Sequence, residues 1–137
     1  MTPDQILLVQ TSFQMVGADG MALATTLQAR LPGEAPVLRR LHSGAPPAEQ
    51  ARQLAAMLVL AVRGLSRSRA LRPALRRLGA RHGADGLAEG ELATFGRALL
   101  ESVEERLGAT LPCAVRDAWA AGYRMQADLV IQGARTA

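Results

Sequence analysis

The chain has 137 residues and a mass of 14.5 kDa. This size favours a single domain that spans residues 1–137 and is too small for a two-domain enzyme. Hydrophobic residues make up 49% of the sequence, which is too many for a disordered chain, and aromatic residues only 3%. Sixteen basic residues, all arginine, stand against 12 acidic ones and give a net charge of +4. Because the two signs are interspersed and aromatic residues are few, this charge disfavours nucleic-acid binding as the function.

A single cysteine, Cys113, excludes an internal disulfide and any paired-cysteine metal or redox site. A buried, inert thiol is the expected state of this residue. No apolar run approaches the roughly 20 residues that a membrane span requires, and Asp4 stands too near the start for a basic secretory segment. We therefore expect a soluble protein of the cytoplasm.

The chain begins with a pattern typical of a helix start. Thr2 and Gln5 have the spacing of a capping box, and Pro3 lies at the first helical position, where its missing N–H costs no hydrogen bond. Two glycines then interrupt the pattern, after which helical periodicity of apolar residues resumes until a Pro-Gly pair. This part of the sequence predicts two helices, over 3–16 and 21–31.

The middle of the chain predicts a turn or short helix over 36–41, followed by a loop, since consecutive prolines do not lie inside a helix. Residues 48–63 then show the spacing of one buried helical face. Four positions of the next segment share one stripe of a helix: Leu71, Leu75, Leu78 and His82. Residues 83–86 are typical of a helix end, which makes His82 the last inward-facing residue of its helix.

Two long helices are predicted to close the chain, over 88–107 and 112–132, with a Gly-Ala-Thr connection between them. Connections of this length are normal between packed helices. The sequence therefore predicts an all-α fold of six or seven helices, packed as a helical sandwich.

With two histidines, one cysteine and no HExxH motif, the chain does not predict a conventional zinc site, and it contains no glycine-rich phosphate loop or nucleophile elbow. Haem differs, because it requires only one strong protein ligand. His82 would present an imidazole at the end of a leucine stripe, with Leu78 one turn before it as a floor. From the residues alone, the alternative is a core histidine whose ring nitrogens bond backbone groups.

Several segments resemble the single-domain bacterial haemoglobins and the globin domain of flavohaemoglobins. LRRLGARHGADGL, residues 75–87, is similar to the proximal segment of that family, and FGRALLESVEERLG, which begins at Phe95, is similar to the helix after it. DAWAAGYRMQADLVIQ, from Asp117, resembles the last helix in its Asp-Ala-Trp and tyrosine placement. In the looser N-terminal half, APVLRRL and EQARQLAAMLVLA resemble the third helix and the distal helix.

The resemblance implies a globin fold, six to seven helices around a haem pocket, with haem b as cofactor and His82 as the proximal iron ligand. It places Gln50 and Leu54 on the distal side. The other residues it brings to the haem are Leu78, Leu87 and Phe95. The implied ligands are oxygen, carbon monoxide and nitric oxide, for oxygen binding or transport, gas sensing or nitric oxide detoxification.

The sequence departs from the family on the distal side. Gln28, or Leu27 if the register shifts by one, stands where the family has an oxygen-bonding tyrosine, and a glutamine retains an amide donor. His42 stands where nearly all globins have a phenylalanine against the haem plane. Three interpretations of His42 remain open: an exposed loop residue, a distal hydrogen-bond donor, or a sixth iron ligand.

The proximal side departs as well, since Leu92 and Ala134 stand where the family has a tyrosine and a glutamate that strengthen the ligand histidine. We therefore expect at most weak nitric oxide dioxygenase or peroxidase activity, with electrons from an external reductase. Arg52 and Arg81 are candidates for the haem propionates or are surface charges. The expected protein is a monomer or homodimer with no nucleic-acid or membrane partner, and the alternative function is a haem-free, globin-like signalling or protein-interaction module.

Overall fold

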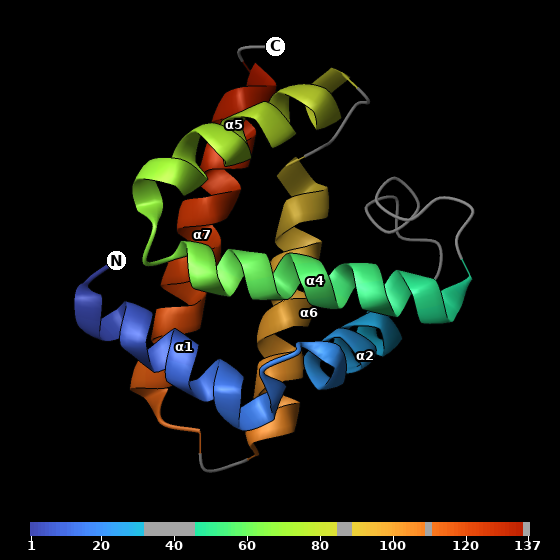
Figure 1. Cartoon of the computed structure of the whole chain (residues 1–137), viewed down its shortest axis with the longest axis vertical. Helices are drawn as coiled ribbons and strands as arrows, with labels where there is room; N and C mark the ends of the chain where they lie inside the picture. Colours follow the sequence, from blue (N-terminus) through green and yellow to red (C-terminus); the bar gives the residue numbers. More distant parts are fainter. Residues whose placement is uncertain (32–45, 85–88, 109–110, 136–137) are drawn as a thin grey trace.

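The computed structural model describes residues 1–31, 46–84, 89–108 and 111–135, and these residues form six α-helices and no strand (Figure 1). In chain order the helices are α1 (Pro3–Gly17), α2 (Met21–Arg30), α4 (Pro47–Gly64), α5 (Ser68–Ala84), α6 (Glu89–Leu107) and α7 (Cys113–Arg135). The predicted all-α fold is confirmed. The turn or short helix predicted over 36–41 lies outside the described residues.

The helix ends show which local signals hold in the folded chain. The capping box of α1 is formed: the Thr2 hydroxyl accepts from the Gln5 amide at 3.1 Å, and the Gln5 side chain accepts from the Thr2 amide at 3.0 Å. By contrast, α5 continues through Gly83 and Ala84, which the sequence predicted to end it. Glycine lowers helix propensity by only about 1 kcal/mol, so it ends a helix only where the backbone also turns left-handed.

The connection between α1 and α2 depends on a glycine. Gly20 has φ +76°, and a Cβ at this position would lie 2.8 Å from the carbonyl oxygen of Ala55 in α4. The chain therefore bends by 91° between the two helices while α2 stays close to α4. In the described part of the chain, no single helix is long and apolar enough to span a membrane, and α1 with α2 reaches that composition only across this bend.

The core lies where helices from both halves of the chain meet. Figure 1 shows α6 and α7 running side by side, with α1 and α5 both packed on α7. The short helix α2 packs against both α4 and α6. The largest fully buried apolar side chains come from four of the helices: Val9, Leu23, Leu27, Leu54 and Val103. Burial of leucine and valine at about 25 cal/mol per Å² is the main stabilising contribution to such a core.

A buried polar contact fixes α7 against α1. The indole N–H of Trp119 donates to the Ser12 hydroxyl at 2.9 Å, and that hydroxyl donates to the Leu8 carbonyl at 2.7 Å. The Trp119 ring also packs on Phe13, with ring centroids 6.4 Å apart. Because the buried indole has a partner, this crossing has no cost from an unsatisfied donor.

The helices α5 and α7 touch backbone to backbone at a pair of glycines, which we call the glycine crossing. A Cβ at Gly79 would lie 1.8 Å from the Val130 carbonyl oxygen, and a Cβ at Gly133 would lie 1.9 Å from the carbonyl oxygen of Arg76. Both distances are far below van der Waals contact, so any side chain at either position would push the helices apart. The position of α5 is therefore determined by α7.

Candidate functional site

The predicted iron ligand lies on α5. His82 is helical, two residues before the end of the helix at Ala84, and its side chain is outside the described part of the structure. Three leucines precede it on the same stripe: Leu71, Leu75 and Leu78. All three are only half-buried, although α5 packs on α7. The protein thus leaves apolar surface incompletely covered one turn before the histidine.

The predicted distal residues begin α4. The amide of Gln50 donates to the carbonyl of Pro46 at 2.9 Å, which places Gln50 in the first turn of the helix, with its side chain half-buried. Leu54, one turn later, is 1% exposed and belongs to the central core. Gln50 and Leu54 thus lie one turn apart at the start of α4.

The two alternatives on α2 have different surroundings. Leu27 is completely buried in the core, whereas Gln28 is half-buried and its amide nitrogen donates to the carbonyl of Pro47 at 3.1 Å. Gln28 therefore links α2 to the first residue of α4. One of its two amide hydrogens is used by this bond, which leaves one for another acceptor.

A half-buried tyrosine, Tyr123, joins α6 to α7 beside the predicted haem contact Phe95. The Phe95 side chain is 7% exposed, and its ring stacks on Tyr123 with centroids 6.1 Å apart. The Tyr123 hydroxyl donates to the Leu92 carbonyl at 2.6 Å. In the sequence, Tyr123 served only to identify the last helix. Leu92 was noted only because the family has a tyrosine at that position. Their hydrogen bond is a contact between residues 31 apart, which no local pattern predicts.

Burial raises the pKa of the Tyr123 phenol well above its ordinary value near 10. The folded protein therefore holds this proton more tightly than the unfolded chain, and the free energy of unfolding should fall as pH rises above about 10. Urea unfolding monitored by circular dichroism across this range measures the decline. The chain has one tyrosine and no lysine, so few other groups titrate there.

Tyr123→Phe is the matched control, since it keeps the ring on Phe95 and removes the phenol. We expect it to lose about 1 kcal/mol at neutral pH, because the Leu92 carbonyl loses its donor, and to lack the alkaline decline. An equal decline in the variant would show that another group causes it.

Other predicted residues fall at the surface or outside the described part. His42 and Leu87 lie outside it. Arg52 is exposed and forms an ion pair with Glu49, 2.6 Å between Nη2 and Oε2, and Arg81 is exposed. The expectation for Cys113 was wrong: its thiol is exposed, because Cys113 is the first residue of α7 and lies beyond the packed part of the helix.

Comparison with known proteins agrees with this arrangement of helices. The globin family matches residues 22–128, and the chain belongs to that family. The chain is also 29% identical, over 133 residues, to proteins named flavohemoprotein in Bordetella parapertussis, Bordetella bronchiseptica and Bordetella pertussis. The match covers 96% of this chain and 33% of each relative, so the chain spans about a third of the relatives' length.

Globins hold haem with a proximal histidine, and the described residues fit that group. The donor set contains an imidazole residue, His82, on a helix whose preceding leucines are half-buried rather than closed off. In contrast, Leu58 and Val62 of α4, which belong to the central core, are 4% and 7% exposed. A flat apolar group bound beside α5 would cover surface that the protein leaves exposed to water.

Proposed function

We propose that this globin binds haem b, with His82 as the proximal iron ligand, and reversibly binds a diatomic gas. The observation that carries the proposal is the position of His82 on α5, at the end of a leucine stripe that the protein itself leaves half-buried. When bound, ferrous haem supplies an iron atom that can coordinate oxygen, carbon monoxide or nitric oxide. Protein side chains alone do not bind these gases.

The residues of the chain would bind and orient rather than react. His82 would hold the iron, and Leu78 would cover the proximal face of the ring with apolar surface. Gln50 offers an amide donor at the first turn of α4, where a hydrogen bond to a bound gas would favour oxygen over carbon monoxide. Leu54, buried one turn later, would exclude water from the same side.

Reversible oxygen binding or gas sensing is the proposed role rather than efficient nitric oxide detoxification. Leu92 is half-buried and Ala134 lies in α7, and neither side chain carries an atom that can accept a hydrogen bond from the ring N–H of the proposed ligand histidine. Without such an acceptor the imidazole donates less electron density to the iron. Weak dioxygenase or peroxidase activity, supported by a separate reductase in the cytoplasm, is part of the same proposal.

The test is the absorption spectrum of the purified protein after titration with haem, in the ferric, ferrous and ferrous carbonyl states. We expect a Soret band that saturates at one haem per chain, shifts on reduction and shifts again with carbon monoxide. A low-spin ferrous spectrum would indicate a sixth protein ligand, for which His42 is the candidate. Absence of a saturable band would contradict the proposal and favour a haem-free interaction module.

A further inference from the structure

The charges of this chain are not evenly interspersed, contrary to the expectation from composition. Seven of the 16 arginines lie within residues 63–81, and this stretch contains no acidic residue. The remainder holds nine arginines against 12 acidic residues, a net charge of −3. The positive charge of the protein is thus concentrated on the last turn of α4, on the turn that follows it and on α5.

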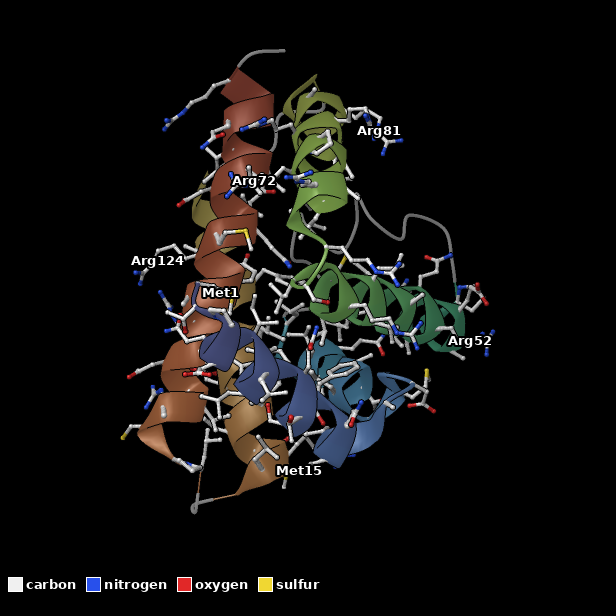
Figure 2. The ribbon with its side chains drawn as sticks, turned by 60° about the vertical axis from the view of Figure 1, so that its left-hand side comes forward. Met1, Met15, Arg52, Arg72, Arg81 and Arg124 are labelled. Atoms are coloured by element: carbon white, nitrogen blue, oxygen red, sulfur yellow. The ribbon has the colours of Figure 1, made fainter. Side chains whose placement is uncertain are left out.

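Four arginines of α5 form one face, which we call the arginine face: Arg69, Arg76, Arg77 and Arg81. At about 100° per residue they span roughly 140° of the helix surface, centred roughly 160° from the stripe of leucines and His82. All four are exposed. Figure 2 shows Arg81 extending away from α7, consistent with this register.

Within the described residues, none of these four guanidinium groups forms an ion pair with a carboxylate, and Arg76 donates a hydrogen bond to the side-chain oxygen of Gln132 at 3.5 Å. By contrast, Arg30 pairs with two glutamates of α6, Glu101 and Glu105, at 3.2 and 3.1 Å. Arg30, Arg52 and Arg116 thus have carboxylate partners, whereas the arginine face has none among the described residues.

We infer that the arginine face docks an acidic one-electron carrier protein that reduces the haem. Exposed guanidinium groups without a carboxylate partner attract acidic side chains and accelerate the encounter with an acidic protein. Arg81 directly precedes His82 on the same helix, so a carrier bound at this end of the face lies across the helix from the proposed iron ligand. The inference rests on the proposed function, because the electron needs haem as its acceptor.

The transfer is a single-electron exchange. A reduced iron–sulfur cluster in the carrier loses one electron, and ferric haem iron gains that electron and becomes ferrous. No atom or proton passes between the proteins. Binding therefore requires only a close, charge-complementary contact, which the exposed arginines provide.

The surroundings of the face argue against a membrane or nucleic acid as occupant. The exposed large apolar side chains of the described residues, Met1, Leu7, Met15 and Leu60, belong to α1, α4 and the N-terminus, none of them to α5. Figure 2 shows Met1 and Met15 on the side of α1. A membrane-bound helix inserts apolar residues beside its basic ones, and single-strand binding uses aromatic platforms, which α5 lacks.

The experiment measures binding of the haem-loaded protein to a plant-type [2Fe–2S] ferredoxin, an acidic one-electron carrier, by calorimetry at low and high ionic strength. The test variant is Arg69→Glu with Arg77→Glu. The matched control is Arg97→Glu with Arg106→Glu, which makes the same charge change at exposed positions of α6. We expect the dissociation constant to rise about tenfold or more in the test variant and about twofold or less in the control at low salt.

Reduction of ferric haem by reduced ferredoxin, followed at the Soret band, should slow in parallel, while dithionite should reduce all three proteins equally. Equal weakening in both double variants, or no binding by the unchanged protein, would overturn the inference. Tighter binding to duplex DNA or to phosphatidylserine vesicles than to ferredoxin would also overturn it. If the protein takes up no haem, the proposed function fails, yet ferredoxin binding lost only in the α5 variant would still support the docking surface.

Discussion

Replacing Gly133 with alanine should destabilise the protein by about 3 kcal/mol, because a single methyl group there cannot be accommodated without moving α5 away from α7. The new Cβ would lie 1.9 Å from the Arg76 carbonyl oxygen, and that atom belongs to helical backbone that cannot rotate away. The free energy of unfolding in urea, measured by circular dichroism, gives the effect directly.

Gly90→Ala is the control for this prediction. Gly90 lies in α6, and a Cβ added there would have nothing within 4 Å, so the same substitution should stabilise the protein by up to about 1 kcal/mol through helix propensity. Gly79→Ala should resemble Gly133→Ala, and the double variant should cost less than the two effects together, since one separation of the helices relieves both contacts. If Gly133→Ala left the free energy of unfolding unchanged, α5 and α7 could not be in close backbone contact at the glycine crossing.

Replacing His82 with glycine should abolish haem retention, and imidazole added in excess should restore it. The substitution removes the proposed ligand and leaves a space of imidazole size, so a free imidazole can take its place on the iron. The measurement is the Soret absorbance that remains with the protein after gel filtration, with and without imidazole. A small loss of stability, about 1 kcal/mol from a glycine near the helix end, should accompany it.

His42→Gly is the matched variant, because it removes the only other histidine of the chain. It should retain haem without added imidazole, and a change from low-spin to high-spin ferrous haem would identify His42 as a sixth ligand. If His82→Gly retained haem as tightly as the unchanged protein, another residue would have to be the iron ligand.

The glycine crossing holds in place a helix, α5, that has two proposed roles. Its inner stripe carries the proposed iron ligand, and its outer surface carries the arginine face. Because α5 is held against α7 by backbone contact, motion of the helix relative to α7 is restricted in the folded state. Gly133→Ala should therefore disturb haem retention as well as stability, whereas the arginine variants should leave haem retention intact.

The sequence by itself determined the class of fold and most helix boundaries, because those depend on interactions between near neighbours. The capping box at Thr2 and Gln5 acts over three residues, and the leucine stripe before His82 repeats with the period of the helix. The resemblance of residues 75–87 and of the last two helices also identified the globin family, which matches residues 22–128.

Only the tertiary structure decided how the helices meet, because the deciding contacts join residues far apart in the chain. No local pattern in the sequence distinguishes Gly79 or Gly133, and both matter because α5 and α7 cross there. The bond from Tyr123 to the Leu92 carbonyl, and that from Gln28 to the Pro47 carbonyl, likewise link separate helices. Local periodicity says which face of a helix is apolar, whereas packing decides what that face touches and which charges stay unpaired.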